Sequence, residues 1–286
     1  MSRRQAVIWL IVVCAVWGGT FTVIKEALEP ASPMRFNAVR FSLAALLLAP
    51  TLRGLTAREL RGGLVLGFFL WAGFTLQTIG LAETTPSRSG FITGLYVPFV
   101  PLVSFVVSRA APRPATLAGV VFAVAGMYLL TGPTAAGGGV NRGDVLTLAC
   151  AVMFACHIVA VEHYTRGSPV HRLLAVQVAL TGLLSWVVGP LVETARFDPT
   201  PRLLVTLGFV AVVSTVVALH LQLRGQQVLS AEQTALIFTL EPVFAALSSF
   251  LVLGERLGAV QWAGGVLILV AMVVPEIGER RHLGET

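Results

Sequence analysis

The fold is decided by a stretch near the C-terminal end, residues 237–255, with the sequence IFTLEPVFAALSSFLVLGE. Its apolar part is long enough to cross a lipid bilayer as a helix, which takes about 20 residues. One acidic residue, Glu241, stands inside the apolar run, and Pro242 follows it directly. A carboxylate is costly inside a membrane, and a proline removes a helix hydrogen bond. The stretch therefore predicts a membrane helix whose interruption has a functional or a structural reason.

Apolar runs of this kind recur along the whole chain of 286 residues, which is 56% hydrophobic and 12% charged. Soluble domains carry about 25% charged residues, so the composition indicates an all-α polytopic membrane protein. We expect ten transmembrane helices, at residues 7–26, 33–51, 62–82, 86–108, 114–131, 144–163, 170–191, 202–223, 230–252 and 259–274.

The net charge of +6 does not indicate nucleic-acid binding, because the basic residues fall in short loops and do not interleave with aromatic residues. Cys14, Cys150 and Cys156 all lie within apolar runs. They are typical of small packing residues and predict neither a disulfide nor a metal site. No cofactor and no metal are expected.

Glycines in the apolar runs indicate close contacts between helices, as small residues do in membranes. The expected contact positions are Gly63, Gly67, Gly119, Gly126, Gly264 and Gly265. Near the C-terminal end, Glu255 and Arg256 are expected in a turn whose carboxylate caps a helix.

The two halves of the chain repeat each other. Residues 14–26 (CAVWGGTFTVIKE) align with residues 150–162 (CAVMFACHIVAVE), and the segments around Pro98 and Pro242 also align. The alternative, that all alanine- and valine-rich helices look alike, explains matches in the same order less well. An odd number of helices per copy inverts the second copy in the membrane, as in many secondary transporters. We therefore expect two inverted five-helix repeats, residues 1–136 and 137–286, around a central cavity.

The distribution of arginines predicts the orientation. With the N-terminus inside the cell, the inner segments hold more arginines than the outer ones, which favours cytoplasmic positions for both termini. The expected location is the cell (inner) membrane, as a multi-pass protein.

Longer motifs carry a family resemblance. Residues 14–28 (CAVWGGTFTVIKEAL), 34–48 (MRFNAVRFSLAALLL) and the segment beginning SAEQTALIFTLEPVF at residue 230 resemble the drug/metabolite transporter superfamily, EamA branch. The resemblance covers essentially the whole chain and implies ten helices, a central cavity and export of small metabolites such as amino acids. The first half departs from the pattern, because no glutamate stands at the position that corresponds to Glu255.

Candidate substrate-binding residues are polar or aromatic side chains on the faces expected to meet at the cavity. Trp17, Thr20 and Phe21 share one face of the first helix, and His157 occupies the repeat position of Phe21. A buried histidine with a structural hydrogen bond is an equally good interpretation of His157. The candidate set is Trp17, Thr20, Phe21, Phe74, Gln77, Tyr96, His157 and Thr215, with Trp71, Gln222 and His220 as further members.

Four residues are candidates for coupling or gating: Glu241, Pro242, Pro98 and Lys25. The two prolines would loosen equivalent helices and form a pair of hinges. Glu241 either couples export to proton movement or is a structural carboxylate, and the sequence leaves both open. Lys25 either binds a substrate carboxylate or anchors its helix at the interface, and anchoring is favoured. Arg40, in the second apolar run, either pairs with a buried acid or reaches an interface, and a structural ion pair is favoured over substrate binding.

The function that these features indicate is secondary transport by alternating access, with amino acids, aromatic or otherwise apolar, as exported substrates. Cationic drugs or nucleoside-like metabolites are alternatives, and an intramembrane enzyme is disfavoured because no catalytic motif appears. Few fixed charges are expected at the cavity, which argues against strongly anionic substrates. The expected partners are a small-molecule substrate and the lipid bilayer, with the protein as a monomer or a weak homodimer.

Overall fold

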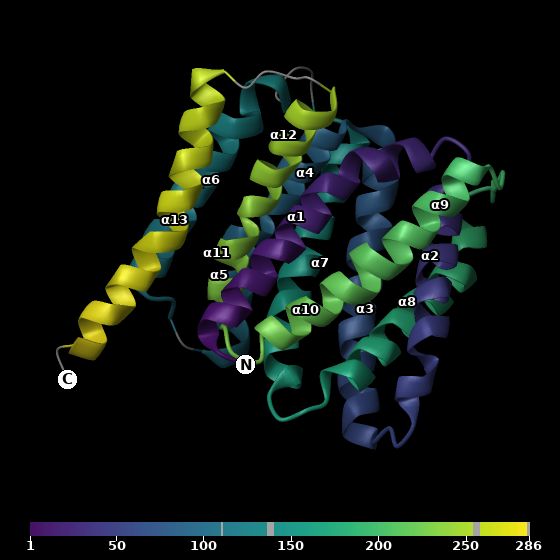
Figure 1. The fold of residues 1–286 in the computed structure, drawn as a ribbon, viewed down its shortest axis with the longest axis horizontal. Helices are drawn as coiled ribbons and strands as arrows, with labels where there is room; N and C mark the ends of the chain where they lie inside the picture. Colours follow the sequence, from purple (N-terminus) through teal and green to yellow (C-terminus); the bar gives the residue numbers. More distant parts are fainter. Residues whose placement is uncertain (110, 136–139, 254–257, 285–286) are drawn as a thin grey trace.

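The computed structural model describes residues 1–109, 111–135, 140–253 and 258–284, and most of these residues are helical (Figure 1). The segments are α1 (Arg3–Ala27), α2 (Pro33–Leu48), the 3-10 turn η1 (Ala49–Leu52), α3 (Ala57–Glu83), α4 (Pro86–Gly94), α5 (Tyr96–Ser108), α6 (Pro114–Ala135), α7 (Arg142–Thr165), α8 (Val170–Val192), α9 (Pro201–Phe209), the π-helix η2 (Val210–Val217), α10 (Ala218–Gly225), α11 (Ala231–Phe238), α12 (Leu240–Leu253) and α13 (Ala259–Gly284). The all-α prediction is confirmed for this part of the chain. Glu255 and Arg256 lie outside the described residues.

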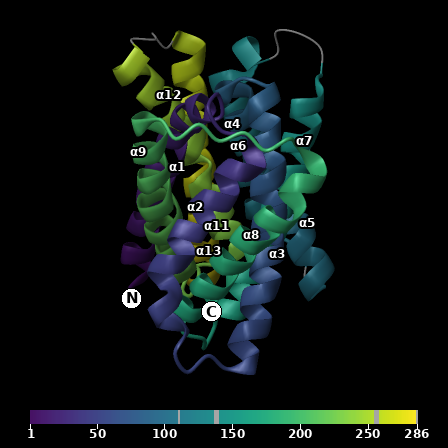
Figure 2. The same cartoon turned by 90° about the vertical axis from the view of Figure 1, so that its right-hand side faces the viewer.

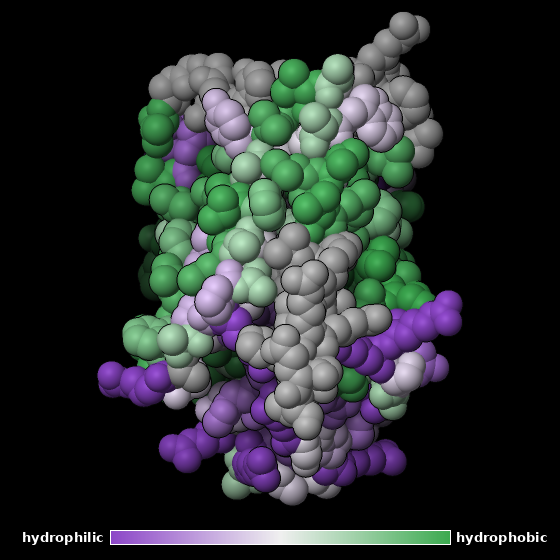
Figure 3. Space-filling model, turned by 90° about the vertical axis from the view of Figure 1, so that its left-hand side faces the viewer, coloured by the Kyte–Doolittle hydropathy of each residue, from purple (hydrophilic) through white to green (hydrophobic). Residues whose placement is uncertain are grey.

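Within the described ranges, six helical segments are long and apolar enough to cross a membrane: Arg3–Ala27, Ala57–Glu83, Ser89–Ser108, Arg142–Thr165, Val170–Val192 and Pro201–Gly225. Figure 3 shows hydrophobic side chains over much of one face and hydrophilic ones gathered at one end. The start of α1 and the end of α13 lie at the same end of the molecule (Figures 1 and 2). These features are those of a multi-pass membrane protein, while ten crossings stay a prediction.

Polar residues fix where several helices begin. Capping boxes precede four helices, with the pairs Ser2 and Gln5 at α1, Thr56 and Glu59 at α3, Asn141 and Asp144 at α7, and Ser230 and Gln233 at α11. In each pair, two side chains satisfy backbone N–H groups that the first helical turn leaves unpaired. The capping residues thus fix where α1, α3, α7 and α11 begin, and all four helices contribute to the cavity described below.

The packing of helices uses the expected glycines. Figure 1 shows α6 beside α13 at one edge of the molecule, and contacts also join α3 to α8. A Cβ atom on Gly63 would lie 2.5 Å from the Val176 Cβ, and one on Gly126 would lie 2.8 Å from the Gly264 carbonyl oxygen. Such contacts leave no room for a side chain, so the prediction of tight contacts is confirmed here and also at Gly67, where the Gln177 Cα would be 3.0 Å away.

The prediction for Gly265 is wrong. A Cβ atom at this position would meet no atom within 4 Å among the residues that the structure describes. The neighbouring Gly264 faces α6 instead, so adjacent glycines on one helix have opposite environments.

Two of the predicted helices are interrupted at matching positions. Leu95 separates α4 from α5, and Thr239 separates α11 from α12. Each interruption lies three residues before a proline, Pro98 or Pro242, and its backbone amide bonds three residues back, at 3.1 Å and 3.3 Å. Proline cannot donate and clashes with the carbonyl group four residues earlier, which explains the tightened turns. The role of the two prolines as hinges stays a prediction.

The predicted helix at residues 202–223 contains a segment that sequence analysis misses. Its middle part, η2, is a π-helix between α9 and α10. The Thr215 hydroxyl donates to the Val210 carbonyl oxygen, five residues earlier, at 2.8 Å. π-helical segments are rare and occur frequently at functional sites.

Candidate functional site

A cavity of about 60 Å³ lies among the helices, and both halves of the chain enclose it. Helices α1 to α5 contribute from the first half, and α7, η2, α10, α11 and α12 from the second. The lining residues are Trp17, Thr20, Phe21, Ile24, Arg40, Leu70, Phe74, Gln77, Thr78, Leu81, Thr93, Tyr96, Phe154, His157, Ile158, Ser214, Leu219, Gln222, Phe238 and Glu241. One water needs about 10–15 Å³ of such volume, so the cavity has room for a few.

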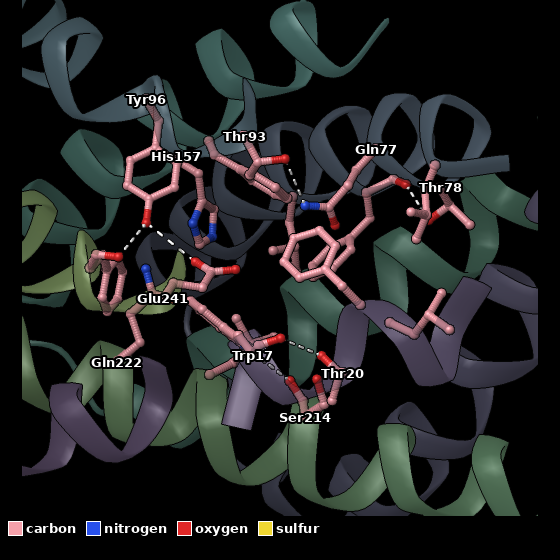
Figure 4. Close-up of a pocket in the computed structure, with 18 of the residues that line it drawn as sticks. Trp17, Thr20, Gln77, Thr78, Thr93, Tyr96, His157, Ser214, Gln222 and Glu241 are labelled. Carbon is pink, nitrogen blue, oxygen red and sulfur yellow. Dashed lines mark hydrogen bonds between the residues drawn. The ribbon is translucent and has the colours of Figure 1, made fainter. Parts of the chain in front are cut away.

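The structure brings most of the predicted site residues together. Figure 4 shows several of them around one space, with aromatic rings beside polar groups. The predicted residues that line the cavity are Trp17, Thr20, Phe21, Phe74, Gln77, Tyr96, His157, Glu241 and Gln222. Their role in binding a substrate stays a prediction.

Other predicted residues lie elsewhere. Within the described chain, the cavity lining does not include Thr215, Lys25, Pro98, Pro242, Trp71 or His220. Thr215 is fully buried and accepts a hydrogen bond from Arg40, while its neighbour Ser214 lines the cavity. Sequence spacing cannot tell these neighbours apart, because η2 departs from the ordinary helical period.

Lys25 lies in the last turn of α1 and makes three hydrogen bonds to backbone carbonyl groups at the end of α3. Its Nζ donates to the carbonyl oxygens of Leu81 at 2.7 Å, Ala82 at 2.9 Å and Thr84 at 2.9 Å. The last carbonyl groups of a helix have no partners within it and attract cations. The arrangement therefore favours an anchoring role over a substrate contact.

Lys25→Met is expected to lower stability by about 1–2 kcal/mol, because it removes charge-assisted bonds to three carbonyl groups. Thermal unfolding of the purified protein in detergent measures this loss. Substrate affinity is expected to stay unchanged, since Lys25 does not line the cavity. A variant with unchanged stability and weakened substrate binding would contradict the anchoring role.

Glu241 reaches the cavity from α12 and is 9% exposed. The Tyr96 hydroxyl lies 3.3 Å from Glu241 Oε2 and 3.3 Å from the Phe238 carbonyl oxygen (Figure 4). Phe238 is the residue whose carbonyl group Pro242 frees, four residues later in the helix. A tyrosine of the first half thus meets both the carboxylate and the freed carbonyl group of the second half.

Trp17 joins α1 to the π-helix. Its Nε1 donates to the Ser214 carbonyl oxygen at 3.0 Å (Figure 4). Its ring packs edge-on against Phe238 with centroids 5.4 Å apart, and Phe238 packs against Tyr96 at 6.3 Å. These rings form a continuous aromatic wall beside Glu241, with each polar tip held by a hydrogen bond.

Amide side chains add polar groups to the lining. Gln77 Nε2 donates to the Thr93 hydroxyl at 3.3 Å, and His157 Nε2 lies 2.9 Å from Gln177 Oε1. Gln222 Nε2 donates to Gln226, but its Oε1 is buried without a hydrogen-bond partner in the described chain. Because buried polar atoms are normally paired, this acceptor at the cavity is available to a ligand or water.

Arg40 corrects the sequence-based expectation. It is 1% exposed, lines the cavity, and forms no ion pair with any acidic residue in the part of the chain that the structure describes. Its polar contacts are the hydroxyls of Thr215 and Ser214, and its guanidinium lies over the Phe74 ring at 4.7 Å. The predicted structural ion pair is therefore wrong. The expectation of few fixed charges at the cavity also needs correction, since this guanidinium belongs to the lining.

Several lining residues are missed by sequence analysis, namely Thr78, Thr93, Phe154, Ser214 and Phe238. Phe238 could have been found from the sequence, because Pro242, four residues later, frees its carbonyl group. Phe154 could have been found as well, since it aligns with Gly18 in the repeated motif of residues 14–26 and 150–162. The two threonines and the serine are common in membrane helices and carry no distinguishing pattern.

A helical membrane protein whose halves enclose a cavity with buried polar and charged side chains has the architecture of a membrane transporter. The chain belongs to the EamA-like transporter family, which matches residues 4–132 and 141–274. The family resemblance inferred from the motifs is thereby confirmed.

Comparisons with single proteins agree with membership of this family. The chain is 36% identical to an uncharacterized transporter of Archaeoglobus fulgidus, over 96% of this chain and 86% of the relative. Proteins named as probable amino-acid metabolite efflux pumps in Escherichia coli and Salmonella typhimurium are 28% and 27% identical, each over 98% of this chain and 97% of the relative. One crystal structure shares the fold, with a TM-score of 0.80 and 19% identity over 98% of this chain and 99% of that chain.

Proposed function

We propose that the protein is a secondary transporter that exports amino acids, foremost aromatic and other apolar ones, by alternating access. The observation that carries the proposal is the mixed lining of the cavity. The aromatic wall of Trp17, Phe238 and Tyr96 suits an apolar side chain, while Glu241 and the unpaired Gln222 Oε1 suit an ammonium group. Such a site, mostly apolar with a few placed polar groups, is typical for small ligands. The names of the two bacterial efflux pumps add support.

Residues 1–136 and 137–286 are proposed as two inverted repeats that together form ten membrane helices. Exchanging the halves turns the α3–α7 contact into the α10–α1 contact, and the α5–α7 contact into the α12–α1 contact. The same exchange maps the α2–α8 and α6–α13 pairs onto themselves. A twofold relation between the halves accounts for this pattern, and the two separate family matches support it.

The proposed setting is the cell (inner) membrane, with both termini in the cytoplasm and the protein acting as a monomer or a weak homodimer. Short protease-sensitive tags at either end are expected to survive protease treatment of intact bacterial cells. Both tags should be cleaved after the membrane is permeabilised. Cleavage of one tag alone in intact cells would contradict the even number of crossings. Cleavage of both tags would show that both termini lie outside the cell, opposite to the proposed orientation.

Flux measurements test the proposed substrate class. Liposomes containing the purified protein are expected to release preloaded aromatic or aliphatic amino acids faster than protein-free liposomes, with saturation as the substrate concentration rises. Cationic dyes and nucleosides serve as comparison substrates. Saturable flux of these compounds, without flux of any amino acid, would reject the proposed class.

A further inference from the structure

We propose that Arg40 binds the carboxylate of the transported substrate and that the cavity therefore selects compounds with this group. The inference rests on the proposed function and deepens it. Among the described residues that line the cavity, Arg40 is the one with a permanent positive charge. A single carboxylate is not a strongly anionic substrate, so the inference is compatible with the expectation drawn from the sequence.

The hydrogen bonds of Arg40 leave donors free. Nε donates to Thr215 Oγ1 at 2.8 Å, and Nη2 lies 3.4 Å from Ser214 Oγ, a long contact. Nη1 has no hydrogen bond to any residue in the described ranges. A guanidinium carries five N–H donors in a planar fork that matches the two oxygens of a carboxylate. The group thus retains donors for a ligand that arrives through the cavity.

Within the described residues, the charge of Arg40 also has no ion-pair partner. The described ion pairs involve Arg142, Arg166, Arg172 and Arg202, each with a glutamate, and none includes Arg40. The rings of Phe41 and Phe74, at 5.1 Å and 4.7 Å, attract the cation but do not neutralise it. An ionised side chain inside a membrane helix is normally paired or lines a substrate pathway. A substrate carboxylate supplies the missing charge.

The surroundings hold Arg40 in place before a substrate arrives. The π-helix presents Ser214 and Thr215 to the guanidinium, and the Thr215 hydroxyl is itself bound to the Val210 carbonyl oxygen. Trp17 fixes the backbone of the π-helix through the Ser214 carbonyl oxygen at 3.0 Å. A pre-positioned binding group loses less conformational freedom on binding, which strengthens it as an anchor. The π-helix therefore has a role in the proposed site, because it holds the Arg40 guanidinium through Ser214 and Thr215.

The polar groups of the cavity lining then complement an amino acid. Ser214, which contacts Arg40, and Glu241 lie on either side of Trp17 in the view of Figure 4. Glu241 and the free acceptor of Gln222 would face the ammonium group, and Arg40 the carboxylate. The aromatic wall between these groups would contact the side chain.

Matched ligands test the carboxylate requirement. We would measure binding to the purified protein by thermal stabilisation, and transport by counterflow in liposomes. The ligands are L-phenylalanine, L-leucine and L-threonine, the amides of the same three, and benzoate and L-lactate as carboxylates without an ammonium group. The amides keep the ammonium group and side chain but lose the negative charge.

Wild-type protein is expected to bind the acids about tenfold or more tightly than the amides. Arg40→Gln should weaken binding of the acids by about 10- to 100-fold and remove the preference over the amides, as loss of a charge-assisted bond does. Arg40→Lys should retain part of the preference. Arg35→Gln is the matched control, because Arg35 lies on the same helix, stacks on Trp186 and does not line the cavity.

The contrary outcomes separate this inference from the proposed function. If Arg40→Gln folds and still prefers acids, or if the wild type binds amides equally well, the role of Arg40 is rejected while amino-acid export stands. If no carboxylate in the panel binds or moves, both are rejected. Should Arg40→Gln fail to fold, Thr215→Val keeps the Arg40 side chain and removes its Nε partner, together with the hydroxyl bond to the Val210 carbonyl oxygen. It is expected to weaken binding of acids more than amides, and equal effects on both would reject the inference.

Discussion

Glu241→Gln is expected to abolish the accumulation of substrate that a pH gradient drives in liposomes, so that the substrate only equilibrates. The carboxylate lies at the cavity and is held by one hydroxyl, that of Tyr96. Such a group can gain and lose a proton as the cavity changes its exposure, whereas glutamine remains neutral. Exchange of substrate between the two sides, which needs no net proton movement, is expected to continue.

The matched control for this experiment is Glu26→Gln, since Glu26 is exposed and pairs with Arg202 away from the cavity. It should accumulate substrate as the wild type does. Tyr96→Phe keeps the carboxylate and removes its hydrogen bond, so accumulation should persist with an altered pH profile. Full accumulation by Glu241→Gln would make this residue structural.

Gly18→Ala is expected to lower stability by about 1–3 kcal/mol, as overpacking of a tight contact does. A Cβ atom at Gly18 would lie 2.5 Å from the Glu241 carbonyl oxygen and 2.9 Å from the Ala245 backbone nitrogen. Because these are backbone atoms, no rotamer change can relieve the clash, and α1 must move away from α12. The midpoint of thermal unfolding in detergent measures the loss, and the shift should also reduce transport.

The adjacent glycine provides the control. Among the described residues, a Cβ atom at Gly19 would meet only the Ser248 hydroxyl, at 4.0 Å. Gly19→Ala should therefore be neutral or stabilise by up to about 1 kcal/mol, because alanine favours helices over glycine. Equal destabilisation by both substitutions would show that the close approach of α1 and α12 does not decide the effect.

Local signals in the sequence predict much of this architecture. Long apolar runs between capping residues mark the helices, and the predicted run at 144–163 falls within α7. The two prolines predict loosened helices, which the structure places at Leu95 and Thr239. Many cavity residues could be predicted because a helical period places Trp17, Thr20 and Phe21 on one face.

Long-range features of the site could not be predicted in the same way. The charge of Arg40 is plain in the sequence, but its partners Ser214 and Thr215 are 174 and 175 residues away. From the sequence alone an ion pair is the natural expectation, and only the structure shows that Arg40 forms none within the described residues. The π-helix is equally hidden, because its run of valines with one serine and one threonine is typical of any buried membrane helix.

The hydroxyl of Tyr96 has a mechanical consequence. Tyr96 is the first residue of α5 and directly follows the Leu95 interruption. Its hydroxyl lies 3.3 Å from the carbonyl oxygen of Phe238, the residue directly before the Thr239 interruption. A change of bend at one interruption must therefore stretch this bond, break it, or shift the other interruption. Such a link favours simultaneous movement of both helices over independent fluctuation. In a transporter that works by the proposed alternating access, we expect synchrony of this kind to limit the time in which both ends of the pathway are open, and so to limit leakage of ions.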